Sequence, residues 1–250
     1  MSRIALITGA TSGIGKATAE LFADAGIDLI LCGRRQEKLD EIAEKLSSKV
    51  EVTTLIFDVR DKGAVAAMIN SLSDDWKNID ILINNAGNAH GLGSLDEGDP
   101  EDWDAMIDGN VKGLLYVSKA VIPLLLERGK GHIVNISSIA GKQTYPNGAV
   151  YCASKAAVEV ISEGMRLELT QHGIKVTNVA PGAVETDFSL VRFKGDEARA
   201  EKVYQGFDPL QAGDIADSIL YAVNAPDRVT IADFTILASA QSTATTIHRK

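Results

Sequence analysis

The chain has 250 residues, of which 45% are hydrophobic and 24% are charged, and its formal net charge is −9. This length suffices for one large core, and the acidic balance disfavours nucleic acid or an anionic membrane as a partner. No apolar run looks long enough to cross a membrane and the N-terminus lacks a secretion-signal pattern, so we expect a cytoplasmic protein with residues 1–250 in one domain.

Cysteine and histidine give no sign of a disulfide framework or a metal site. Cys32 and Cys152 are isolated and are expected to be small buried residues, with a redox role for Cys152 as the less favoured interpretation. The four histidines show no ligand spacing, and no cysteine or acid completes a metal set. We therefore expect no bound metal.

Short apolar runs alternate along the chain with helix-length amphipathic stretches. Apolar, β-branched runs suit strands that are covered on both faces, whereas acids early and lysines late in a stretch suit helices. Strands are predicted at residues 4–7, 29–31, 52–57, 79–83, 132–136, 176–180 and 234–237, and two of the helices at residues 16–25 and 36–46. This alternation predicts right-handed βαβ units and an open parallel sheet.

A glycine-rich turn, residues 8–15, follows the first predicted strand and opens the first predicted helix. Glycines allow the backbone to turn tightly and approach a pyrophosphate, and the helix start presents free N–H groups to that anion. Lys16 is followed by Ala17 rather than Ser or Thr, which argues against a Walker-type triphosphate site. The residues expected to bind a dinucleotide here are Gly9, Thr11, Ser12, Gly13, Ile14 and Gly15.

Arg34 and Arg35 follow the second predicted strand. An NAD site usually places an acid about 20 residues after the glycine-rich turn, and this chain has arginine there. Guanidinium groups bind phosphate through fixed, paired donors, so both arginines are expected to bind the 2′-phosphate of NADP. The alternative is that they only solvate the start of the next helix, where positive charge is mildly unfavourable.

Two stretches fit neither the strand nor the helix pattern. Residues 88–100 are rich in glycine and aspartate and should loop past the fourth predicted strand. Residues 188–208 fall between the sixth strand and the next helix. Ligands of open parallel sheets lie outside the carboxyl ends of the strands, and long insertions are usually functional. We expect 188–208 to be a substrate-covering loop, with a plain surface connection as the alternative.

A proton-transfer set is predicted around Tyr151. Lys155 lies four residues later and shares its helix face, and Ser138 lies thirteen residues upstream. A free tyrosine has a pKa of about 10, which an adjacent ammonium and a positive nicotinamide ring should lower, so that Tyr151 acts as acid and base. Ser138 should bind the same substrate oxygen, and Lys155 also the nicotinamide ribose. Ser137 is the alternative to Ser138, and Ser154 is expected to be a packing residue.

In this order the motifs resemble those of the short-chain dehydrogenase/reductase family of the classical type. The resemblance rests on residues 8–15 and 84–87 and on Asn110, Ser138, Tyr151, Lys155, Pro181, Gly182 and Thr186. It implies a single Rossmann-type, doubly wound α/β domain of about seven parallel strands with helices on both faces. Many members are tetramers that pair through the helices carrying Asn110 and Tyr151, so a homotetramer is expected.

The family resemblance also implies further cofactor and catalytic residues. Asn110 would hold a water in a proton relay that ends at Lys155. The cofactor contacts would be Asp58 and Val59 at the adenine, Asn85, Ala86 and Gly87 along the cofactor, Tyr151 and Lys155 at the ribose, and Pro181, Gly182, Val184 and Thr186 near the nicotinamide.

Three features narrow the substrate. The chain lacks the Val-Asp-Gly-Gly ending typical of the family's 3-oxoacyl-carrier-protein reductases. Residues 188–196 and 248–250 resemble a subgroup that acts on 3-hydroxy acids, including serine, allo-threonine and 3-hydroxypropionate-type acids. A carboxylate substrate needs a cationic anchor, which Arg192 or Lys194 would provide beside Ser138 and Tyr151. Arg192 would otherwise anchor the loop or touch the cofactor phosphates.

We therefore expect an NADP-dependent oxidoreductase that moves a hydride between NADP(H) and the carbinol or carbonyl carbon of a small 3-hydroxy acid. A broad-specificity NADPH-dependent carbonyl or polyol reductase is the alternative enzyme. An alternative of another class is a non-catalytic dinucleotide sensor or scaffold, because a fold alone does not determine function.

Overall fold

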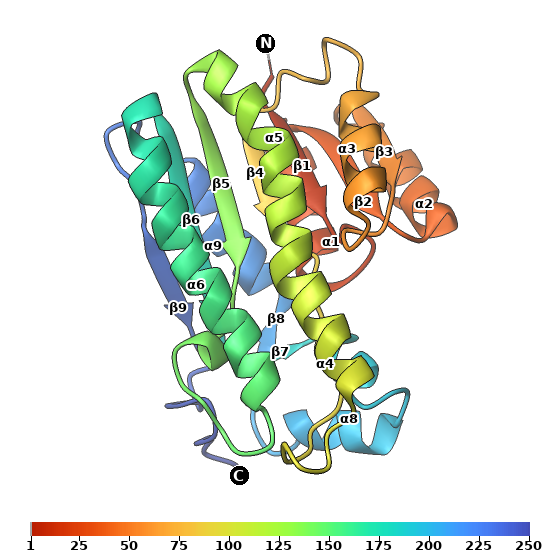
Figure 1. Ribbon diagram of the computed structural model, residues 1–250, viewed down its shortest axis with the longest axis vertical. Coiled ribbons are helices and arrows are strands. Elements are labelled where there is room, and N and C mark those ends of the chain that lie inside the picture. The colour runs from red at the N-terminus through yellow and green to blue at the C-terminus, as the bar shows by residue number, and fades with distance from the viewer. Residues whose placement is uncertain (1) are drawn as a thin grey trace.

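Seven parallel strands form the central sheet of the computed structural model, which describes residues 2–250 (Figure 1). These strands are β1 (Ile4–Thr8), β2 (Asp28–Gly33), β3 (Val52–Ile56), β4 (Ile81–Asn84), β5 (Gly131–Ile136), β6 (Ile174–Pro181) and β9 (Asp233–Ile236). Their order is β3-β2-β1-β4-β5-β6-β9, so the direction of winding reverses between β1 and β4. The predicted doubly wound α/β fold is confirmed.

Helices cover both faces of this sheet (Figure 1). They are α1 (Gly13–Asp24), α2 (Gln36–Leu46), α3 (Lys62–Asn70), α4 (Pro100–Ile107), α5 (Leu114–Arg128), α6 (Ala149–Leu169), α7 (Phe188–Arg192), α8 (Glu197–Tyr204) and α9 (Ala212–Val223). Short turns are η1 (Asp108–Gly113), η2 (Ile139–Gly141) and η3 (Thr170–His172), and β7 (Val184–Glu185) pairs with β8 (Leu210–Gln211) in a separate ribbon. In Figure 1, α5 and α6 lie in front of the sheet and α1 and α9 lie behind it.

The central strands are apolar on both sides because they separate two cores. Successive side chains of a strand point to opposite faces, so Ile7 packs with Phe22 of α1 and Ile219 of α9, whereas Leu6 packs with Val121 of α5 and Val158 of α6. All six side chains are fully buried. This arrangement explains why continuous apolar runs, rather than alternating ones, marked the strands.

Most predicted strands differ from the observed ones by one or two residues at an end, and three differences from the prediction have an identifiable structural basis. The fourth strand begins at Ile81 rather than residue 79, because the Asp80 carboxylate accepts a hydrogen bond from Ile4 N (2.9 Å) and leads into the strand. The first helix begins at Gly13, inside the glycine-rich turn. The predicted loop 188–208 contains α7 and α8, and Asp196 caps α8 by accepting from Arg199 N (3.0 Å).

One continuous helix, Pro100–Arg128, is long and apolar enough by length and composition to cross a membrane, and 44% of its apolar window is buried in the fold. Sequence analysis did not identify this helix as long enough to span a membrane, because Asp108 and Lys112 interrupt its apolar residues. These two residues form an ion pair at 2.7 Å. The helix packs against α3 and α6 as part of the core. Core helices pass the same test, so this is weak evidence for a membrane span.

Candidate active site

A cleft of about 1140 Å³ opens at the carboxyl ends of the parallel strands. The segments after β1 and β4 both line it, and this is where the strand order reverses, the usual ligand position in such sheets. Every predicted site residue contributes to the lining except Gly15, Asn110 and the alternative anchor Lys194. The structure thus gathers the predicted residues in one place, although their individual roles stay predictions.

The glycine-rich turn after β1 has a backbone that other residues would not tolerate. Gly9 and Gly13 have φ values of +67° and +52°, in the left-handed region. A Cβ on Gly15 would overlap the Gly9 carbonyl oxygen and the Asn85 side-chain amide. Asn85 Nδ2 donates to Thr8 O (2.9 Å) and Gly9 O (3.2 Å), so it holds the turn against the end of β4.

The start of α1 is suited to a phosphate group. Ser12 is its N-cap residue, yet the Ser12 side chain accepts no capping hydrogen bond from the first amides of α1. Ser12, Gly13 and Ile14 line the cleft, so these amides are available to an anion there. Arg35 Nη2 donates to Thr11 Oγ1 (2.6 Å) and thereby reaches over the turn. Together these groups place positive charge where a dinucleotide phosphate would bind.

A third arginine, Arg60, joins the two predicted ones at the mouth of the cleft. Arg60 binds the Asp58 carboxylate through Nε (3.0 Å) and Nη2 (2.7 Å), and Arg34 lies 3.5 Å from the same group. The hydrogen bonds from Arg60 hold the pKa of Asp58 below its ordinary value, so Asp58 stays ionised. Sequence analysis missed Arg60, although its position two residues after Asp58 was a usable signal.

Ser138, Tyr151 and Lys155 meet at the edge of this cleft, and all three are buried. Tyr151 and Lys155 lie on successive turns of α6. Ser138 follows β5 and caps the η2 turn, since its Oγ accepts from Ala140 N (3.1 Å). Ser137 instead donates to Lys155 O (3.1 Å) and supports the backbone of α6. This geometry favours Ser138 as the hydroxyl next to Tyr151.

Burial dominates the electrostatics of Tyr151. It raises the pKa of the phenol well above the ordinary value, Tyr145 adds to this rise, and Ser138 and Arg192 oppose it. Lys155 Nζ donates to Ile136 O (2.9 Å), and burial lowers the pKa of Lys155 to about 8. The groups of the protein alone thus favour the protonated phenol. The lowering of the Tyr151 pKa expected from Lys155 together with a positive nicotinamide ring stays a prediction.

Asn110 lies beneath the cleft, within the π-helical turn η1. Its Oδ1 accepts from Asn88 N (2.7 Å), and its Nδ2 donates to Asn88 O (2.8 Å) and Ser154 Oγ (3.0 Å). A relay water would therefore have to contact the backbone of Asn110, since its side chain holds the loop after β4. Ser154, predicted as a packing residue, also donates to Tyr151 O (2.7 Å).

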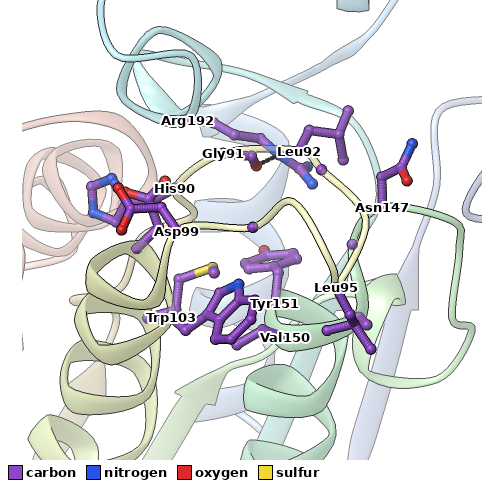
Figure 2. A pocket seen from close by; sticks show the side chains of 16 residues that line it. His90, Gly91, Leu92, Leu95, Asp99, Trp103, Asn147, Val150, Tyr151 and Arg192 are labelled. Atoms are coloured by element: carbon purple, nitrogen blue, oxygen red, sulfur yellow. Dashed lines mark hydrogen bonds between the residues drawn. The ribbon is translucent and has the colours of Figure 1, made fainter.

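Arg192 of α7 lies over the ring of Tyr151. Its guanidinium carbon is 5.5 Å from the centre of the Tyr151 ring and 5.6 Å from that of Tyr145. Nε donates to Gly91 O (3.2 Å) and Nη2 to Tyr145 Oη (3.2 Å). Figure 2 shows Arg192 and Gly91 on one side of a small pocket and Trp103 and Val150 on the other. Sequence analysis did not identify Tyr145.

Lys194, which sequence analysis allowed as a substrate anchor, is occupied by ion pairs outside the cleft. Its Nζ pairs with Asp102 (2.9 Å) and Asp99 (3.6 Å), and the residue is absent from the cleft lining. Among residues 2–250, no carboxylate forms an ion pair with Arg192, which leaves its charge available to an anion in the cleft. The structure thus favours Arg192 over Lys194 as an anion-binding residue.

Comparisons with known proteins agree with this geometry. The family model for short chain dehydrogenases matches residues 3–196. Sulfoacetaldehyde reductase 2 of Chromohalobacter salexigens is 46% identical over 97% of this chain and 96% of that protein. NADP-dependent 3-hydroxy acid dehydrogenase YdfG of Escherichia coli K12 is 41% identical over 99% of this chain and 100% of its own length.

A solved structure shares the fold over nearly the whole chain. The closed form of serine dehydrogenase complexed with NADP+ superposes with a TM-score of 0.93, at 41% identity over 99% of this chain and 100% of that one. The ordered motifs, the doubly wound sheet and these matches lead to one conclusion: the chain belongs to the short-chain dehydrogenase family.

Proposed function

We propose that this chain is an NADP-dependent dehydrogenase/reductase that acts on the carbinol or carbonyl carbon of small 3-hydroxy acids. The observation that carries the proposal is the meeting of Ser138, Tyr151 and Lys155 in the cleft that the glycine-rich turn and the arginines also line. The relatives with NADP in their names support the cofactor assignment. The candidate dinucleotide-binding residues and the candidate proton-transfer residues thus line one cavity, as hydride transfer requires.

The proposal assigns a role to each of the four candidate catalytic residues. NADP, when bound, carries the hydride, and the residues of the chain position the substrate and move its proton. Tyr151 donates its phenolic proton to the carbonyl oxygen during reduction and accepts it back during oxidation. Ser138 donates a hydrogen bond to the same oxygen as negative charge develops there. Lys155 interacts with the cofactor ribose, and Asn110 maintains the loop on which Gly87 lies.

The relatives suggest a common substrate geometry. A 3-hydroxy acid has one carbon between its carbinol carbon and its carboxylate, and sulfoacetaldehyde has one carbon between its aldehyde and its sulfonate. We propose that Arg192 and Tyr145 bind this anionic group while Ser138 and Tyr151 bind the reacting oxygen. Arg192 is close enough to the Tyr151 ring, at 5.5 Å, for a short substrate to span both.

A substrate panel tests the assignment. Oxidation of serine, allo-threonine, 3-hydroxypropionate and 2-hydroxyethanesulfonate would be followed by the absorbance of NADPH. We expect turnover of anionic substrates with this one-carbon spacing and much slower turnover of neutral alcohols. Turnover of neutral ketones or sugars without turnover of hydroxy acids would instead establish a broad carbonyl or polyol reductase. NADP binding without any turnover would establish a sensor or scaffold.

Replacing both Arg34 and Arg35 with alanine should raise KM for NADP by about 100-fold and change KM for NAD only a few-fold. Charge-assisted hydrogen bonds contribute about 1.5–3 kcal/mol each, and only NADP carries the 2′-phosphate. Steady-state kinetics with both cofactors would measure this selectivity. The control is replacement of Lys62 and Lys130, two exposed lysines outside the cleft, which removes the same charge. Equal losses with both cofactors would contradict the phosphate assignment.

Replacing Arg192 with glutamine should raise KM for 3-hydroxy acids by about 10- to 100-fold, because a charge-assisted contact to the substrate anion is lost. Arg192→Lys should recover part of the affinity, since it restores charge without the paired donors. A neutral carbonyl substrate is the internal control, and its KM should change little. Loss of the same size with neutral and anionic substrates would mean that Arg192 only shapes the site around Tyr151.

We also propose a homotetramer in the cytoplasm. The outer faces of α5 and α6 expose Leu115 (41%), Leu126 (39%), Val160 (69%) and Leu167 (78%). Apolar residues repeated along two neighbouring elements of one sheet face are typical of a protein interface. Sedimentation velocity should show a tetramer, and Leu167→Glu with Val160→Glu should shift it to smaller species.

A further inference from the structure

The segment that follows β9, residues 238–250, forms one wall of the cleft. Gln241, which is 7% exposed, anchors its first part: its Oε1 accepts from Ala183 N (2.9 Å), next to the loop predicted to lie near the nicotinamide. Gln241 and Ile247 form an antiparallel bridge, and Ala244 N donates to Gln143 Oε1 (2.8 Å). The segment is thereby fixed to the loops after β5 and β6.

The last residues of the same segment form hydrogen bonds with the C-terminal end of α8. The Arg249 guanidinium donates to Val203 O (3.0 Å) and to Gln205 O, two carbonyls at the C-terminus of that helix. It also lies 5.1 Å from the centre of the Phe207 ring, within cation–π range. A cation that bonds the last carbonyls of a helix satisfies them and interacts favourably with its dipole.

Backbone contacts also connect the end of this segment to the turn after α8. Lys250 N donates to Gly206 O (2.7 Å). Gly206 has a φ value of +79°, and a Cβ there would lie 3.1 Å from Arg249 Cβ. The glycine thus permits both the turn after α8 and the close approach of the Arg249 side chain.

Contacts continue from α8 to the catalytic tyrosine. Tyr204, the last residue of α8, donates to Val184 O (2.9 Å) and lies 2.8 Å from Ser189 Oγ of α7. Helix α7 also carries Phe188, whose ring centre is 5.7 Å from that of Tyr151, and Arg192. The position of α8 therefore affects the two α7 side chains that face the reacting centre. In Figure 1 these elements and the C-terminus gather at the same lower end of the molecule.

We propose that Arg249 is a positioning residue that holds α7 and α8 closed over the cleft. No other side chain connects residues 238–250 to the end of α8 by hydrogen bonds among residues 2–250. The guanidinium reaches two carbonyls at once, which a lysine ammonium at the same position would do less well. The inference rests on the proposed role of residues 188–208 as a substrate cover, and it holds for any substrate that binds beneath them.

Arg249→Ala should raise KM for the substrate about tenfold and change kcat less than threefold, because one charge-assisted contact of about 1.5 kcal/mol corresponds to tenfold in affinity. Lys250→Ala is the matched control: it removes the same charge one residue away, and its side chain does not line the cleft. Arg249→Lys should recover part of the loss. Equal effects of Arg249→Ala and Lys250→Ala on KM, or none for either, would overturn the proposal.

Limited trypsin digestion gives a second result that needs no substrate. Lys194, Arg199 and Lys202 are cleavage sites within or beside α8. With NADP present, cleavage there should be several-fold faster in Arg249→Ala than in Lys250→Ala. Equal digestion rates would overturn the role of Arg249. Faster digestion without turnover of any hydroxy acid would support that role while rejecting the proposed substrate class, so the two failures are distinguishable.

Discussion

Tyr151→Phe should lower kcat/KM by about 10³ or more while NADP affinity changes only a few-fold. The substitution removes one oxygen from a buried ring and keeps the contact with Phe188, whose ring centre lies 5.7 Å away. Positioned proton transfer contributes about 10² to 10⁴ in rate, and no other hydroxyl of α6 lines the cleft as a replacement. Single-turnover reduction with preformed enzyme–NADPH complex would measure the chemical step directly.

Two matched variants separate catalysis from packing. Tyr221→Phe removes the same atom from an exposed tyrosine, 66% exposed on α9 and far from the lining residues, and should leave kcat unchanged. Ser138→Ala should lower kcat by a smaller factor than Tyr151→Phe, about 10² to 10³, as loss of one donor to a developing charge does. A Tyr151→Phe enzyme with nearly full activity would reject the proposed proton donor outright.

The fold could be predicted because strands that are buried on both faces have continuous apolar runs in the sequence. Strands such as β1 and β2 separate two cores, so every residue of their central runs is apolar and the runs are recognisable. Glycines at Gly9, Gly13 and Gly15 are required by backbone angles and close contacts, so the turn was recognisable too. Residues 188–208 were harder, because two short helices with few buried side chains resemble a loop.

The site was predicted where its residues are linked by local spacing, and missed where tertiary contacts create it. Tyr151 and Lys155 share one helix, so their spacing was informative. Tyr145 and Gln241 reach the cleft through loops, and nothing in their local sequence indicates it. The burial of the Tyr151 phenol, which raises its pKa, could not be predicted from the sequence either, since it depends on how the surrounding loops pack.

Lys155→Met should lower kcat/KM by about 10² to 10³ and also weaken NADP binding. Lys155 lines the cleft one helical turn after Tyr151, and a Cβ on Gly87 would come within 3.3 Å of its Nζ. Removing it takes away both the proposed ribose contact and positive charge beside the proton donor. NADP titration by fluorescence and steady-state kinetics would measure the two effects. Lys112→Met, an exposed lysine of η1, is the control for charge.

The free energies of unfolding of the wild type and of Lys155→Met, compared at several pH values, should also reveal the titration of Lys155. Its pKa is lowered by burial from an ordinary value of 10.5 to about 8. Between these values the unfolded chain binds this proton and the folded chain does not, so raising the pH stabilises the folded state. Below about pH 8 both states are protonated and the cost of burying the charge is constant.

The free energy of unfolding of the wild type, minus that of Lys155→Met, should therefore increase with pH from about 8 to 10.5, by roughly 3 kcal/mol in total. The subtraction cancels groups that both proteins share, such as Tyr151 and Cys32, whose raised pKa values act in the opposite direction at higher pH. Urea unfolding at pH 7, 9 and 10.5 would measure the difference. A difference that stays constant across this range would mean that Lys155 keeps its ordinary pKa, and a positively charged Lys155 would then persist at alkaline pH.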